Sequence, residues 1–99
     1  MGTKMNLIDV QPYYKVQREV SSIDQKDIEL ERHLYLYSDK VVTEHREFSI
    51  NEIMDMSYRQ FGKAGGLLYL HTLRGVFSYN VKVSPQTFID SYKEYIGKW

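Results

Sequence analysis

The sequence predicts a mainly β fold with one C-terminal helix. Nine Tyr residues lie among Val and Leu in a chain of 99 residues, and all three residue types suit strands. Between residues 53 and 83, apolar and polar residues alternate with a period of two, which is typical of strands with one buried face. After Ser84 the apolar spacing becomes helical. We therefore expect an antiparallel sheet with a helix closing one open end of its core.

Residues 53–83 are expected to form a three-stranded meander, with strands at 53–60, 66–73 and 76–83. A five-residue loop at 61–65 sets Gln60 opposite Gly66, and Arg74-Gly75 closes the second hairpin. One face is then apolar: Met54, Met56 and Tyr58 oppose Thr72, Leu70 and Leu68, which in turn oppose Phe77, Tyr79 and Val81. The reverse face carries Asp55, Ser57, Arg59, Leu67, Tyr69, His71, Leu73, Ser78, Asn80 and Lys82.

The glycine-rich segment FGKAGG, residues 61–66, invites comparison with a phosphate-binding loop. A P-loop needs Gly-x-x-x-x-Gly-Lys-Ser/Thr followed by a helix whose N-terminus faces the phosphate. Here Lys63 comes directly after Gly62, and a strand pattern follows. We therefore interpret the segment as a hairpin turn in which glycine supplies backbone freedom.

A second hairpin is predicted in the stretch ERHLYLYSDKVVTEHREFSI, with its turn near Ser38-Asp39. Two registers are open. The first pairs Tyr37 with Lys40, Leu36 with Val41, Leu34 with Thr43, His33 with Glu44 and Glu31 with Arg46. The second pairs Tyr37 with Val41, His33 with His45 and Glu31 with Glu47. We favour the first, because the second turns Glu44 and Arg46 inward.

The two ends of the chain complete the predicted elements. A further strand is expected within residues 13–20, followed by a turn at SSIDQKD. For the helix, Ser84 suits the N-cap and Pro85 the first helical position. Its apolar side is expected to comprise Phe88, Tyr92, Tyr95 or Ile96, and Trp99.

Length and composition indicate a single domain over residues 1–99, with a core at about 28–97 and an irregular extension at 1–12. Thirteen basic and thirteen acidic residues leave no net charge, so we expect no nucleic-acid partner. The absence of Cys excludes disulfides and thiolate chemistry. With no pattern of a signal peptide or membrane span, a cytoplasmic location is expected.

The histidines are the candidate metal ligands or catalytic bases, because they can change charge near neutral pH. The second hairpin register would assemble a site from Glu31, His33, His45 and Glu47. Because we favour the other register, we expect no metal, cofactor or catalytic residue. His71, placed opposite Ser78, could suggest a base beside a nucleophile, but neither sits in a nucleophile elbow, so a position on the sheet surface is preferred.

Three cations, Lys40, Arg59 and Lys63, lie near predicted strand ends and are the candidate anion-binding residues. If those ends met at one end of a barrel, they could bind an anionic lipid headgroup.

The segments LYLYSDKVV, FSINEIMDMSYR, GGLLYLHTLRGVFSYNV and SPQTFIDSYKEYI together resemble small bacterial PH-like domains of the pleckstrin-homology superfold. The resemblance covers about residues 28–97. It implies a bent antiparallel sheet, or partly open barrel, of about seven strands capped by an α-helix. Lys15 and Arg18 are followed by an acidic run, unlike members that bind phosphoinositides, and the only Trp is Trp99 instead of a mid-helix residue.

PH-like domains are generally binding modules, so the expected function is a noncatalytic binding or scaffolding module, acting through protein interaction or self-association. The candidate interface is the apolar set Leu67, Tyr69, Leu73 and Val76. The alternatives are a small metal-dependent enzyme using His33 and His45, and a module that binds anionic membrane lipid.

Overall fold

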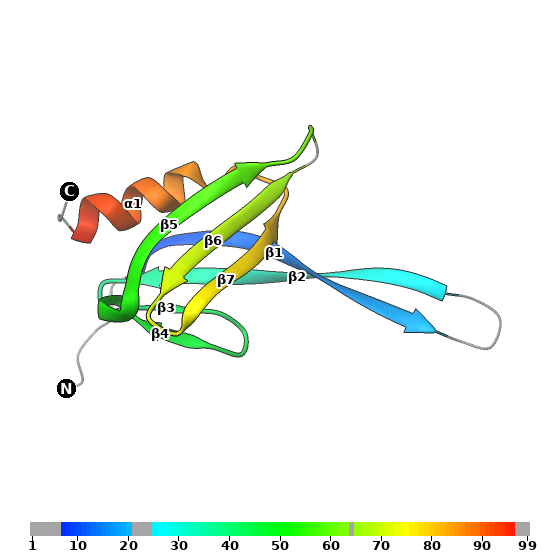
Figure 1. Cartoon of the computed structure of the whole chain (residues 1–99), viewed down its shortest axis with the longest axis horizontal. Coiled ribbons are helices and arrows are strands. Elements are labelled where there is room, and N and C mark those ends of the chain that lie inside the picture. Colours follow the sequence, from blue (N-terminus) through cyan, green and yellow to red (C-terminus); the bar gives the residue numbers. More distant parts are fainter. Residues whose placement is uncertain (1–6, 21–24, 64, 97–99) are drawn as a thin grey trace.

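The computed structural model describes residues 7–20, 25–63 and 65–96. It consists of one seven-stranded antiparallel sheet, which is not closed, and one C-terminal helix (Figure 1). The elements are β1 (Leu7–Val20), β2 (Gln25–Tyr37), β3 (Lys40–Val42), β4 (Glu47–Ser49), the 3-10 turn η1 (Ile50–Glu52), β5 (Ile53–Gln60), β6 (Gly66–Thr72), β7 (Gly75–Val81) and α1 (Gln86–Ile96). The strand order is β4-β3-β2-β1-β7-β6-β5. The predicted fold class, mainly β with one C-terminal helix, is confirmed.

The sheet divides where β1 meets β7. Within the described residues, Tyr14 and Asn80 form the only bridge between these strands. Beyond it, β1 and β2 continue as a long two-stranded ribbon that leaves the rest of the sheet, while β7 runs with β6 and β5 (Figure 1). The sheet therefore has two parts, β1 to β4 and β5 to β7, joined at one bridge.

The core lies between these two parts and α1. Its buried apolar residues are Tyr13, Leu34, Leu36, Val41, Phe48, Ile53, Met56, Leu68, Leu70, Val81, Phe88, Ile89 and Tyr92. Alternating strand positions supply the sheet residues, as Leu34 and Leu36 of β2 illustrate. Phe48 of β4 packs on Phe77 of β7 with ring centroids 5.0 Å apart, so the two parts meet across the core.

The helix covers the core beside β1 and β5. Ser84 caps it as predicted, since its hydroxyl accepts a hydrogen bond from the Gln86 N–H at 3.3 Å, although α1 begins at Gln86, one residue after the predicted Pro85. Phe88 and Tyr92 are each 1% exposed, which confirms their predicted burial. Tyr95 is 51% exposed and does not belong to the buried side, and Trp99 lies outside the described residues.

The β5–β6 hairpin has the predicted register, with Gln60 opposite Gly66 and Met56 opposite Leu70. The Phe61 N–H donates to the Gly65 carbonyl at 2.8 Å, and Gly62 has a φ of +59°, so the glycine-rich segment is a turn. The prediction for Met54 was wrong. A bulge between Ile53 and Asp55 places Ile53, instead of Met54, opposite Thr72, and Met54 is 53% exposed.

The β6–β7 hairpin keeps the predicted faces but not the predicted partners. Leu68 opposes Tyr79 and Leu70 opposes Phe77, two residues away from the expected register. The turn residues are Leu73 and Arg74, and Gly75 begins β7 with a φ of +121°. Because the shift is an even number of residues, the apolar face remains apolar.

The first register of the β2–β3 hairpin is confirmed next to its turn, where Leu36 opposes Val41. The expected pairing does not continue, because β3 ends at Val42 and the chain turns back to form β4. The pairs predicted farther from the turn, Leu34 with Thr43, His33 with Glu44 and Glu31 with Arg46, are therefore absent from the ladder. The second register is not adopted.

The N-terminal strands are longer than predicted. β1 begins at Leu7 instead of within residues 13–20, and β2 begins at Gln25, inside the segment expected to turn. Of that segment, residues 21–24 lie outside the described part of the chain. No helix in the described ranges is long and apolar enough to cross a membrane.

Candidate binding cleft

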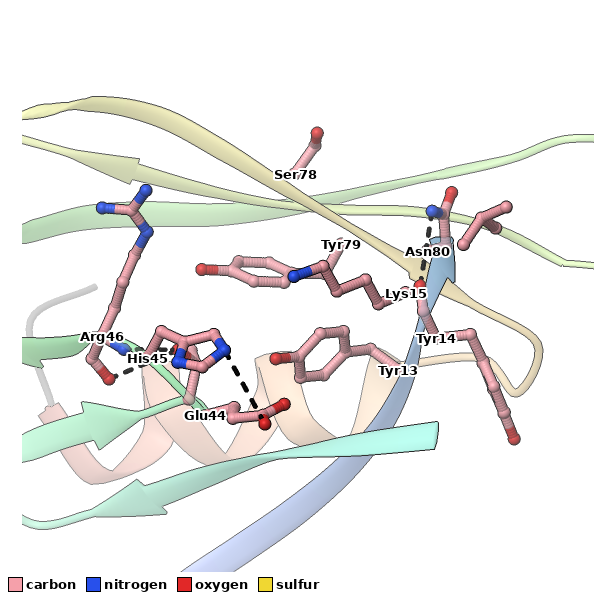
Figure 2. A pocket seen from close by; sticks show the side chains of 11 residues that line it. Tyr13, Tyr14, Lys15, Glu44, His45, Arg46, Ser78, Tyr79 and Asn80 are labelled. Atoms are coloured by element: carbon pink, nitrogen blue, oxygen red, sulfur yellow. Dashed lines mark hydrogen bonds and ion pairs between the residues drawn. The ribbon is translucent and has the colours of Figure 1, made fainter. Parts of the chain in front are cut away.

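An open cleft of about 580 Å³ lies where β1 and β7 separate. Three segments line it: Tyr13–Val16 of β1, Thr43–Arg46 between β3 and β4, and Ser78–Asn80 of β7. Figure 2 shows side chains from all three segments; the Tyr13 and Tyr79 rings lie side by side, whereas the Tyr14 and Ser78 side chains point away from them. The cleft exists because β1 leaves β7 immediately after the Tyr14–Asn80 bridge. We call it the β1–β7 cleft.

Tyr13 and Tyr79 form an aromatic pair in the cleft. Their ring centroids are 5.0 Å apart and their planes cross at 73°, an edge-to-face arrangement. Both residues come from the core face of the sheet, and Tyr13 is 8% exposed. In Figure 2 both hydroxyls point toward the side on which His45 and Arg46 lie. The pair thus offers a ligand both aromatic surface and polar hydroxyls.

Both hydroxyls are held in the protonated form. Burial raises the pKa of Tyr79 from 10.0 to about 12, and the nearby Tyr13 adds to this, against the opposing influence of Arg46, Arg74 and Thr43. Burial also raises the pKa of Tyr13, with Arg32 and Thr43 acting in the opposite direction. At neutral pH the two phenols are therefore neutral hydrogen-bonding groups.

The segment from Thr43 to Arg46 is a tight turn that forms one wall of the cleft. The Thr43 N–H donates to the Arg46 carbonyl at 2.8 Å, and the Arg46 N–H donates to the Thr43 hydroxyl at 3.0 Å. Glu44 forms an ion pair with Arg32, and its carboxylate lies 3.7 Å from Nε2 of His45. Arg46 lies over the Phe77 ring with its guanidinium carbon 4.7 Å from the centroid.

The cleft carries more positive than negative charge. Lys15 and Arg46 line it and are exposed, and neither forms an ion pair with any of the side chains that the structure describes. The acidic residue of the lining, Glu44, is already paired with Arg32. The remaining charge therefore favours an anionic group on a ligand.

One edge of β7 faces the cleft without a strand partner. In an antiparallel sheet, successive residues direct their N–H and C=O groups to opposite neighbouring strands. The Phe61–Gly65 hydrogen bond shows that Gly65 directs its carbonyl to β5, so Gly66 directs its backbone groups to β7, where it is paired with Val81. Every second residue of β7 before Val81, namely Asn80, Ser78 and Val76, then directs its N–H and C=O away from β6. Asn80 is bridged to Tyr14, but Ser78 and Val76 have no partner strand among the described residues.

The four residues of the candidate interface do not form one continuous stripe. Leu73 is 71% exposed in the β6–β7 turn, and Val76 is 59% exposed beside it. Tyr69 and Leu67 are half-buried farther along β6, opposite the polar residues Ser78 and Asn80. Only Leu73 and Val76 are strongly exposed.

The three candidate anion-binding cations are not brought together. Lys40 pairs with Ser49 at the start of β3, next to η1, and its ammonium lies 3.5 Å from Glu47. Arg59 is near the opposite end of β5, since η1 leads directly into the first residue of that strand, and Lys63 is in the turn beyond it. Six residues of strand separate Ile53 from Arg59, which is about 20 Å.

The three histidines contact different residues and are not grouped together. His33 is 3.3 Å from Glu31, whereas His45 contacts Glu44. No group of three His, Asp or Glu side chains placed to hold a metal ion occurs in the part of the chain that the structure describes. His71 is opposite Val76, not Ser78, and its Nε2 is 2.8 Å from the hydroxyl of Ser57.

The sequence did not predict this cleft, and Tyr13, Thr43 and Tyr79 were not among the candidate site residues. They come from three distant segments, and only the separation of β1 from β7 brings them together. The local signal that did exist was an aromatic and a basic residue on the same side of β1, at Tyr13 and Lys15. Comparison with protein-family models and with curated proteins finds no match to the chain.

Proposed function

We propose that this chain is a noncatalytic protein-binding module with a PH-like fold. The strand order β4-β3-β2-β1-β7-β6-β5, followed by a C-terminal helix that packs on β1 and β5, is the arrangement expected of such a domain. The sequence resemblance of residues 28–97 supports the same assignment. Because one fold serves many functions, the functional part of the proposal rests on the cleft.

The observation that carries the proposal is the convergence of the Tyr13–Tyr79 pair, two cations and an open strand edge in the β1–β7 cleft. A volume of about 580 Å³ suits a short segment of a partner protein. The raised pKa values of both tyrosines favour holding a ligand over proton transfer near neutral pH. These features support binding in place of catalysis.

The test is affinity capture with three forms of the immobilised protein. Wild type is compared with the double variant Lys15→Glu/Arg46→Glu, which reverses the charge of the cleft. Lys63→Glu makes the same type of change in the exposed β5–β6 turn and is the matched control. We expect at least one protein to be retained by wild type and by the control but lost from the double variant. Identical sets of captured proteins from all three forms would contradict the proposal.

Self-association through the exposed residues of the β6–β7 turn is the second candidate. Leu73 and Val76 are the specific support, since both are more than half exposed at neighbouring positions. Sedimentation velocity at micromolar concentration should then show a dimer or larger species that Leu73→Lys converts to a monomer. A monomeric wild type at these concentrations would remove this candidate.

A further inference from the structure

The edge of β7 before Asn80 has no strand partner among the described residues. It extends from Gly75 to the residue before Asn80, which is about 17 Å of strand. Val76 and Ser78 present their N–H and C=O groups along it, as the alternation of the meander requires. Such an edge can pair with an added strand of four or five residues.

The surroundings of the edge specify the chemistry of that strand. Lys15 lies across the cleft on β1, and Arg46 lies in the turn on its other wall. Glu44 contributes little negative charge, because it is paired with the permanently charged Arg32. An acidic side chain on the bound strand would therefore meet two cations, and its neighbours would meet the Tyr13 and Tyr79 rings.

The ribbon explains why the edge stays open. β1 is committed to β2 along its whole length, through thirteen residue pairs from Leu7 with Tyr37 to Val20 with Gln25. The two strands leave β7 together after the Tyr14–Asn80 bridge, so β1 does not cover Ser78 and Val76. An unpaired edge is normally avoided because it invites pairing with another chain, so its retention beside a charged cleft favours a recognition role.

We propose that the β1–β7 cleft binds an extended acidic peptide segment of a partner protein, which pairs with the Val76–Ser78 edge as an additional antiparallel strand. The inference rests on the proposed binding function and specifies its ligand. The peptide's acidic side chain is held by Lys15 and Arg46, and its backbone supplies the remaining contacts with β7.

The first experiment selects ligands from a random nonapeptide phage library on the immobilised full chain. We expect enriched sequences with Asp or Glu flanked by β-branched or aromatic residues. Fluorescence polarisation with the most enriched peptide then gives its Kd. The double variant Lys15→Glu/Arg46→Glu should bind about tenfold weaker or worse, whereas Lys63→Glu should bind like wild type. No enrichment, or enriched peptides without acidic residues, would overturn the inference.

The second experiment tests strand addition itself. Two versions of the enriched peptide are made. In one, the amides at odd-numbered positions are N-methylated, and in the other, the amides at even-numbered positions are N-methylated. Because a single strand edge uses every second amide, one version should lose about tenfold or more in affinity and the other should bind like the parent. In the NMR spectrum of the protein, the amide signals of Val76 and Ser78 should shift on binding. Equal affinities for the two versions would overturn strand addition.

Different results would contradict the proposed binding function and the strand-addition inference. If affinity capture finds a protein that depends on Lys15 and Arg46 but the methylated peptides bind equally, the binding function stands and the strand-addition inference falls. If the charge-reversed double variant retains every captured protein, the proposed function itself falls. Circular dichroism of each variant confirms that it is folded before binding is interpreted.

Discussion

The Tyr13 ring meets the Tyr79 ring edge to face, at 5.0 Å between centroids, and this contact joins the two parts of the sheet next to their single bridge. Tyr13 belongs to β1 and Tyr79 to β7, so the contact holds together strands that are bridged at only one position within the part of the chain that the structure describes. The same pair forms the aromatic part of the cleft. The contact that joins the two parts of the sheet and the proposed binding site therefore involve the same two side chains.

The raised pKa of Tyr79 predicts a loss of stability at high pH. Burial disfavours the phenolate, so the folded-state pKa of about 12 exceeds the ordinary value of 10.0. The resulting stabilisation is complete below pH 10 and is lost as the pH rises from about 10 to 12. Tyr79→Phe should therefore lose less free energy of unfolding than wild type across this range, as measured by urea denaturation.

The control for this prediction is Tyr95→Phe, which changes an exposed tyrosine of α1 away from the cleft. It should follow the wild-type curve. If Tyr79→Phe also follows that curve, the environment assigned to the Tyr79 hydroxyl is incorrect.

The bulge in β5 predicts a contrast between two methionines. Met56 is 1% exposed and packs in the core, whereas Met54 is 53% exposed. Met56→Ala should lower the free energy of unfolding by about 3 kcal/mol through lost burial and a residual cavity. Met54→Ala should change it by less than about 0.5 kcal/mol. Chemical denaturation measures the free energy of unfolding of both variants. Comparable losses of this free energy would show that the bulge is misplaced.

Two glycines of the β5–β6 hairpin should respond differently to Ala. At Gly66 a Cβ atom would overlap the carbonyl oxygen of Arg59, whereas at Gly62 no atom lies within 4 Å of the added Cβ. Gly62→Ala should cost about 1 kcal/mol, because its φ of +59° disfavours a side chain. Gly66→Ala should cost more than about 2 kcal/mol, since backbone atoms must move. Thermal or urea unfolding that ranks them the other way would count against this hairpin geometry.

The helix is fastened to β5 by one buried hydrogen bond. The Tyr92 hydroxyl donates to the Ile53 carbonyl at 2.9 Å, and both residues are buried. Tyr92→Phe leaves that carbonyl without its donor and should destabilise the fold by about 1 kcal/mol. Tyr95→Phe, on an exposed position of the same helix, should cost less than about 0.5 kcal/mol. Equal effects in denaturation experiments would indicate that the Tyr92 hydroxyl is not buried against Ile53.

Much of the meander and the helix could be predicted because their signals are local. Alternation fixed which faces of β5, β6 and β7 are buried, and an even shift of register left those faces unchanged. Ser84 and Phe88 marked the helix in the same way. The prediction for Met54 was wrong because a bulge between Ile53 and Asp55 adds one residue at the start of β5 without altering the alternation of the residues that follow.

The cleft could not be predicted, because it depends on where two strands part. The pairing of β1 with β2 extends to residues whose polar sequence resembles a turn, and along this extension β1 is not paired with β7. Tyr13 and Tyr79 look like ordinary core tyrosines in the sequence. Their role in a cleft follows only from the long-range arrangement of the ribbon.

The open edge of β7 is tested most directly by amide hydrogen exchange of the free protein, followed residue by residue by NMR. We predict alternation, with slow exchange at Phe77 and Tyr79, which pair with β6, and fast exchange at Val76 and Ser78, whose amides point away from β6 and have no partner strand among the described residues. Equal protection of all four amides would contradict the account, because it would mean that another strand already occupies the edge.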